Sequence, residues 1–97
     1  VKHTKLTGRL ISKVAICGGA GAFLMEKAVK EHADAFLTGE IKYHDYFYYE
    51  DRILATEIGH YESEQYTKEI LRDILHKKFP ALRIELTRIN TNPIKYL

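Results

Sequence analysis

Short apolar runs alternate with longer amphipathic stretches along most of this chain. Each apolar run is bounded by glycine or polar residues, which is typical of strands; the runs lie at 13–17, 35–38 and 53–58. The stretches that follow have the spacing of helices with one apolar face; they lie at 22–32, 44–50 and 61–77. This alternation predicts an α/β sandwich with a central, mostly parallel or mixed sheet that is flanked by helices.

The same pattern gives finer expectations for individual faces. The first helix is expected to turn inward Phe23, Leu24, Ala28 and Val29. The longest helix has its apolar stripe at Ile70, Leu71, Ile74 and Leu75. A row of side chains that begins just before this helix and continues along it should point into the core: His60, Glu64, Thr67, Leu71 and Leu75. Segment 82–86 alternates strictly and predicts a half-exposed strand, and segment 1–6 also looks like the edge of a sheet.

Composition narrows the class of protein. The 97 residues predict one domain, 1–97, and a content of 45% hydrophobic and 29% charged residues is typical of a folded chain. The net charge of +2 comes without a basic stripe, so nucleic acid is not an expected partner. No apolar run approaches the roughly 20 residues that span a bilayer, so no membrane partner is expected. The single Cys17 favours a reducing, cytoplasmic location.

Three polar segments are expected to meet at one edge of the sheet. They follow the predicted strands and cover Cys17–Gly21, Thr38–His44 and Gly59–Glu64. Because parallel strands have their carboxyl ends at the same edge, glycines, acids and histidines gather there, where open α/β sheets bind ligands.

His60 and Glu64 are the first candidates for chemistry. They are four positions apart, so one helical turn places them on the same face. Imidazole nitrogen and carboxylate oxygen suit zinc, iron or manganese, although the positive end of a helix opposes a cation. Two interpretations stay open at this point: a pair of metal ligands, or a hydrogen-bonded pair at the start of a helix.

Two further segments carry candidates. Glu40 and His44 lie in a polar stretch after the second strand, where they serve either as a base or ligand or as part of a helix-capping loop. Segment 17–22 could bind an anion through its backbone amides, but it lacks a nucleotide-binding fingerprint, and a tight turn is favoured. The aromatic residues of 43–49 indicate core packing together with a subunit interface.

Together these segments resemble the Nif-three-like family, whose members are often called GTP cyclohydrolase 1 type 2 homologues. The resemblance rests on the ordered set Val14-Ala15-Ile16-Cys17-Gly18-Gly19-Ala20-Gly21, Ala33-Asp34-Ala35-Phe36-Leu37-Thr38-Gly39-Glu40-Ile41-Lys42-Tyr43-His44-Asp45 and Gly59-His60-Tyr61-Glu62-Ser63-Glu64. It implies two divalent metal ions (zinc, iron or manganese) per full-length chain, with His60 and Glu64 among the ligands. Glu40 and His44 are then the candidate catalytic residues near the metals.

The resemblance also carries expectations for the whole protein. The family's adjacent histidine pair has no match here, so the chain is expected to be the C-terminal portion of a longer Nif-three-like protein, inactive by itself. The implied protein is a homo-oligomer, a hexameric ring, with metal-dependent hydrolysis of a nucleotide-like or phosphorylated small molecule whose identity the sequence leaves open. The alternative is a non-catalytic assembly or interaction module with a structural or regulatory metal.

Overall fold

The computed structural model describes residues 1–96 and divides the chain into two compact units. The first unit is Val1–Glu64 and the second is Gln65–Leu97. The candidate residues Glu40, His44, His60 and Glu64 all belong to the first unit, so the site is built from that unit alone.

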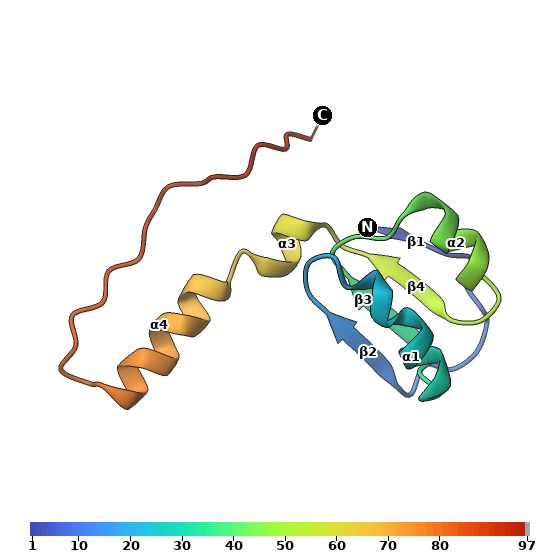
Figure 1. Cartoon of the computed structure of the whole chain (residues 1–97), viewed down its shortest axis with the longest axis horizontal. Coiled ribbons are helices and arrows are strands. Elements are labelled where there is room, and N and C mark those ends of the chain that lie inside the picture. Colours follow the sequence, from blue (N-terminus) through green and yellow to red (C-terminus); the bar gives the residue numbers. More distant parts are fainter. Residues whose placement is uncertain (97) are drawn as a thin grey trace. The chain divides into compact units, whose positions relative to one another are not determined.

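The first unit contains a mixed four-stranded sheet (Figure 1). Its strands are β1 (Lys2–His3), β2 (Val14–Cys17), β3 (Ala35–Thr38) and β4 (Leu54–Glu57), in the order β1-β4-β3-β2. The pairs β2–β3 and β3–β4 are parallel, and β1 pairs antiparallel with β4. The predicted α/β class, the mostly parallel or mixed sheet and the strand edge at the N-terminus are therefore confirmed.

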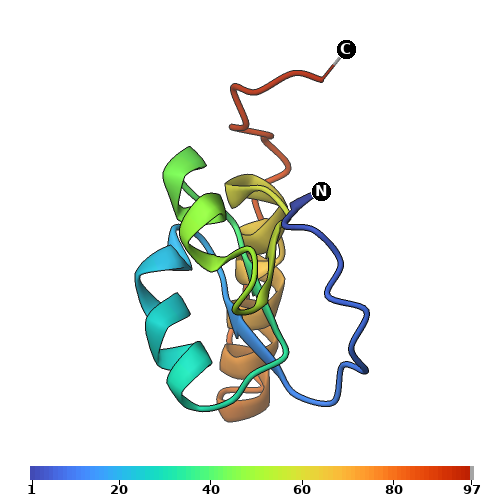
Figure 2. The same ribbon diagram turned by 90° about the vertical axis from the view of Figure 1, so that its right-hand side faces the viewer.

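Helices cover one face of this sheet. They are the 3₁₀ helix η1 (Gly21–Leu24), α1 (Met25–Lys30) and α2 (Tyr43–Tyr49). Figure 2 shows α1 and α2 on one side of the strands, while the segment between β1 and β2 runs along the other side. Val14 and Ile16 of the edge strand β2 point to that second side and remain 50% and 72% exposed.

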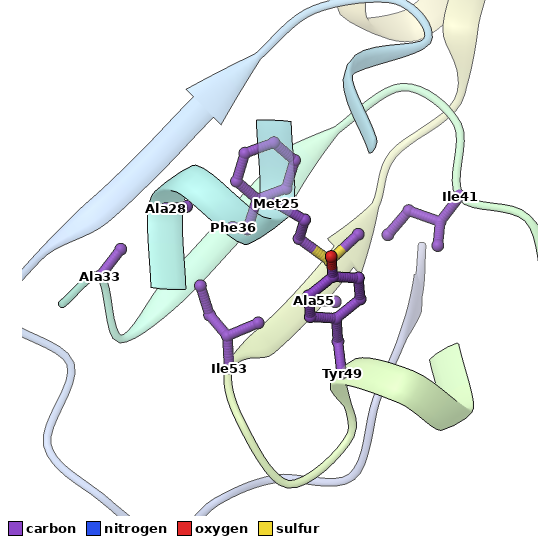
Figure 3. Close-up of a cluster of buried hydrophobic side chains, with 8 residues drawn as sticks. All are labelled: Met25, Ala28, Ala33, Phe36, Ile41, Tyr49, Ile53 and Ala55. Atoms are coloured by element: carbon purple, nitrogen blue, oxygen red, sulfur yellow. The ribbon is translucent and has the colours of Figure 1, made fainter. Parts of the chain in front are cut away.

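The core of the first unit lies between the sheet and its helices (Figure 3). Its buried members are Met25, Ala28, Ala33, Phe36, Ile41, Tyr49, Ile53 and Ala55. The predicted inner positions Ala28, Leu24 and Val29 contribute to it, but Phe23 is 80% exposed, so that prediction is wrong. The reason is the 3₁₀ turn at the start, which changes the helical phase and gives the inward position to Met25.

The long helix predicted at 61–77 is interrupted. The structure has α3 (His60–Glu64) and α4 (Thr67–Lys78), separated at Gln65 and Tyr66. The Ser63 hydroxyl donates to the carbonyl of His60 and competes with regular helical bonding at this point. The row of side chains therefore does not continue from α3 into a core, and Leu71 and Leu75 on α4 are 54% and 40% exposed.

Segment 82–86 forms no strand, which corrects the prediction from its alternation. Ile84 and Leu86 are half-buried while Arg83 and Glu85 are exposed, so the alternation of faces is present without the ladder. A strand exists only when a neighbouring strand accepts its backbone bonds, and the described part of the chain places none beside this segment.

Core packing generates the first prediction. Phe36 is only 2% exposed, so Phe36→Ala should lower the free energy of unfolding by about 3–5 kcal/mol through lost burial and a residual cavity. The same substitution at the exposed Phe23 is the matched control and should change it little. Urea unfolding of both variants measures the difference. Equal losses in the two variants would contradict the assigned core.

Asp34 generates a pH-dependent prediction. Its carboxylate accepts hydrogen bonds from the Ser12 amide and hydroxyl and from the Lys13 amide, which lower its pKa below the ordinary value. A lowered carboxyl pKa stabilises the fold above the unfolded value of about 3.9, and this contribution is lost as pH falls through the folded value. Asp34→Asn should therefore lower the unfolding midpoint at pH 7, with the gap to wild type closing in acid. A gap that is independent of pH would show that the charge has no role.

Candidate functional site

The loops that follow β2 and β3 meet the start of α3 at the carboxyl edge of the sheet. The carbonyl of Gly19, after β2, accepts the amides of Gly39 and Glu40 at 2.9 and 3.1 Å. The amide of Gly19 in turn donates to the hydroxyl of Ser63 on α3 at 2.9 Å. The expected meeting of these three segments at one edge is confirmed.

Two carboxylates flank the imidazole of His60 at this edge. Nδ1 of His60 lies 2.8 Å from Oε1 of Glu40, and Nε2 lies 3.2 Å from Oε2 of Glu64. The side chains of all three residues remain about half exposed, at 46%, 57% and 52% for His60, Glu40 and Glu64. The structure thus joins three of the four residues singled out in the sequence into one accessible cluster.

The two carboxylates favour the protonated imidazole. The hydrogen bond to Glu40 is the main cause that raises the pKa of His60, and the charges of Glu64 and Glu40 add to it, while partial burial acts in the opposite direction. With both nitrogens protonated, the ring donates to Glu40 on one side and to Glu64 on the other. The hydrogen-bonded pair at a helix start, which was one of the two open interpretations, is therefore present.

The donor chemistry also fits a divalent metal, but only as part of a ligand set. One imidazole and two carboxylates are ligands that zinc, iron and manganese accept. Among residues 1–96, however, no three His, Cys, Asp or Glu side chains are arranged to hold a metal ion by themselves. The residues present would therefore fit a metal ion only together with further ligands.

His44 lies apart from the cluster. It is in the first turn of α2, its side chain is 80% exposed, and its Nε2 is 3.8 Å from Asp45. It shares with Glu40 a cleft of about 720 Å³ that also includes Lys2, Phe23, Asp45 and Glu57. His44 is thus placed to contact a molecule in the cleft, and it does not contact His60 in this arrangement.

Glu57 belongs to the site although the sequence pattern did not reveal it. This buried carboxylate accepts the amide of Ile41 and the hydroxyl of Tyr46, each at 3.0 Å, and pairs with Lys2. Burial acts to raise its pKa, but the bonds from Lys2, Ile41 and Tyr46 outweigh burial and lower the pKa overall. A glutamate at an inward strand position next to the carboxyl edge was the available signal, because such positions are normally apolar.

In the glycine turn after β2, the backbone amides of Gly19 and Gly21 are hydrogen-bonded within the protein. Gly19 has φ of +62°, a conformation that glycine adopts without strain, and its amide is used by Ser63. The amide of Gly21 donates to the hydroxyl of Thr38 and to the carbonyl of Gly19. The turn is thus tight, as favoured, and these two amides are bonded within the protein rather than directed at an anion.

The aromatic residues of α2 divide between two environments. Tyr49 is buried in the core, while Tyr43 and Phe47 are 79% and 62% exposed and pack edge to face with ring centroids 5.2 Å apart. The predicted core role is confirmed for Tyr49. The predicted subunit interface remains a prediction.

Comparison with known proteins covers nearly the whole chain. The family described as Duf34/NIF3 (NGG1p interacting factor 3) matches residues 1–93. Proteins named GTP cyclohydrolase 1 type 2 homolog are 38% identical in Staphylococcus epidermidis and 37% identical in Staphylococcus aureus, over 99% and 100% of this chain. The chain spans 27% and 28% of the length of these two relatives.

Solved structures agree on the fold. The crystal structure of Staphylococcus aureus protein SA1388 is similar with a TM-score of 0.78 at 28% identity, covering 99% of this chain and 33% of that one. A Bacillus cereus protein related to NIF3 is similar in fold, with a TM-score of 0.68 at 22% identity, covering 99% of this chain and 28% of the other. Among the described residues, no helix has both the length and the apolar character that crossing a membrane requires.

The flanking carboxylates generate a prediction for His60. In metal-free protein, Glu40→Gln should lower the pKa of the imidazole toward its ordinary value, because a neutral amide stabilises the imidazolium less than a carboxylate does. Glu85→Gln, at an exposed acid that pairs with Arg83, is the control and should leave it unchanged. NMR titration of the His60 ring protons measures both. An unchanged value in Glu40→Gln would rule out the contact.

Proposed function

Because the chain belongs to the DUF34/NIF3 family, we propose that it supplies one edge of a centre for two divalent metal ions, with His60 and Glu64 as ligands. Zinc, iron and manganese all suit this donor pair. The remaining ligands would come from the rest of the protein, since the chain spans about a quarter of its relatives' length and residues 1–96 hold an incomplete set.

The contact between Glu40 and Nδ1 of His60 carries this proposal. A histidine that binds a metal through one nitrogen usually donates its other N–H to a carboxylate, a backbone carbonyl or a water molecule, which fixes the tautomer and the ring orientation. With Nδ1 directed at Glu40, the nitrogen left to bind a metal is Nε2, which lies 3.2 Å from Oε2 of Glu64. The pair then offers a nitrogen and an oxygen to the same side, while Glu40 holds the ring.

The function that this arrangement best supports is metal-dependent hydrolysis. A bound metal pair would supply a water of lowered pKa. The adjoining cleft is large enough for a small molecule. Lys42 lines it and would meet the phosphate of a phosphorylated or nucleotide-like substrate, while Lys2, which also lines it, is paired with Glu57. His44 lines this cleft with an exposed ring that can accept or donate a proton. Glu40 also lines the cleft and contacts the proposed ligand His60.

A second candidate function is assembly without catalysis. The exposed aromatic pair Tyr43 and Phe47 favours a contact between copies of the protein in a homo-oligomer, for which a hexameric ring is our proposal. In that case any metal is structural or regulatory. We place either form of the protein in the cytoplasm.

Metal content tests the leading proposal. The intact protein, purified without chelator or affinity tag, should contain close to two metal ions per chain by mass spectrometry. His60→Ala/Glu64→Ala should lose most of that metal, because both donors are removed. The control His76→Ala/Glu85→Ala removes a histidine and a glutamate that are exposed elsewhere and should retain it.

Two outcomes separate the candidate functions. Metal that is negligible in wild type, or equal in wild type and the site variant, would overturn the metal centre. If metal falls and the oligomer dissociates in the site variant, while phosphorylated small molecules are not hydrolysed by wild type, the assembly function is favoured over the hydrolase.

A further inference from the structure

Ser63 of α3 is hydrogen-bonded to the loop that follows β2. The hydroxyl of Ser63 donates to the carbonyl of His60 at 2.8 Å and accepts the amide of Gly19 at 2.9 Å. Ser63 precedes Glu64 and follows His60 by three positions, so its contacts act on the turn that carries both proposed ligands. A single hydroxyl therefore bonds α3 to the loop that follows β2.

The backbone carbonyl of Gly19 extends this connection to the loop of Glu40. Its carbonyl accepts the amides of Gly39 and Glu40, and it also accepts the hydroxyl of Thr38 at 3.1 Å. Gly19 is buried, so these bonds are shielded from water. Its N–H thus holds the helix of His60 and Glu64, while its C=O holds the loop of Glu40.

We infer that Ser63 is a positioning residue of the proposed metal centre, acting through the backbone of Gly19. We call the contacts of Ser63, Gly19 and the Gly39–Glu40 amides the Ser63 clasp. The inference rests on the proposed metal centre and adds the device that sets its geometry. Glu40 lies on one loop and His60 on a separate helix, and the clasp fixes the distance between them, so that Nδ1 is directed at Glu40 and Nε2 at Glu64.

The close packing around the clasp supports this role. A Cβ atom on Gly39 would lie 2.6 Å from the Gly19 carbonyl oxygen and 2.8 Å from the Ser63 hydroxyl oxygen. A Cβ on Gly19 would lie 2.4 Å from Oε1 of Glu64. At Gly39 the backbone of the other loop leaves no room for a Cβ, whereas at Gly19 the near atom is the movable end of the Glu64 side chain and glycine is favoured by its φ of +62°. A displacement of Ser63 or of the Gly19 carbonyl is therefore expected to shift the loop of Glu40 against α3.

The test removes the hydroxyl in the intact protein. Ser63→Ala should weaken binding of Zn²⁺, measured by competition with a chelator, by about 10–100-fold, as is usual when a group that orients a ligand is lost. Ser63→Thr keeps a hydroxyl and should restore binding toward wild type. Ser12→Ala removes a hydroxyl that is bonded to Asp34, outside the site, and is the matched control. Gly39→Ala perturbs the clasp from the other loop and should weaken Zn²⁺ binding in the same way.

A second readout does not depend on metal. In metal-free protein at a pH where the ring is neutral, the ¹⁵N shifts of His60 should report the Nδ1–H tautomer in wild type and in Ser63→Thr. A mixture of tautomers is expected in Ser63→Ala, together with faster hydrogen exchange of the Gly19 amide. Unchanged ring shifts in Ser63→Ala would overturn the clasp, whether or not the protein binds metal. A third outcome is that wild type binds no Zn²⁺ while Ser63→Ala still changes the tautomer of His60. The clasp would then be retained as the device that orients the imidazole, and the proposed metal centre would be overturned.

Discussion

The buried backbone of Gly19 is the constraint on which the candidate site depends. Its carbonyl receives the amides of Gly21, Gly39 and Glu40 and the hydroxyl of Thr38, and its amide reaches Ser63. Parallel strands bring their carboxyl ends to one edge, but the ladder of a sheet ends there and does not align the loops beyond it. The alignment of the loops and α3 must come from contacts such as these. A left-handed conformation at a residue without a Cβ makes the close approach possible.

The electrostatics of the cluster follow from this alignment. Two carboxylates at the nitrogens of one imidazole favour a positive charge on the ring, and they raise its pKa above the ordinary value. If the proposed centre binds a metal ion, the ion would carry part of that charge, and protons and metal would compete for the same nitrogen. The hydrogen-bonded pair and the metal ligands, which the sequence left as alternatives, would then be two states of one arrangement.

The sequence predicted the elements and contacts that depend on local pattern. It did not predict those that depend on residues far away in the chain. Segment 35–38 was predicted with the bounds that β3 has, and His60 with Glu64 was recognised because one helical turn fixes their proximity. Ser63 and Glu57 were missed, since their partners Gly19 and Ile41 are far away in the chain and no spacing rule connects them. The strand at 82–86 and the inward row on α4 were wrong because a periodic pattern defines a face but does not provide what covers it.

The loop of Glu40 shows how an exposed side chain can still be held firmly. The amides of Gly39 and Glu40 donate to the Gly19 carbonyl, and the next amide, that of Ile41, donates to the carboxylate of Glu57. Three successive backbone groups are thus bonded to two different elements, although the Glu40 carboxylate itself is 57% exposed. Glu57 stays ionised at neutral pH because its bonds outweigh the effect of burial on its pKa, so this attachment is charged and strong. A carboxylate on so fixed a loop needs little reorganisation to orient His60, which is what a preorganised site requires.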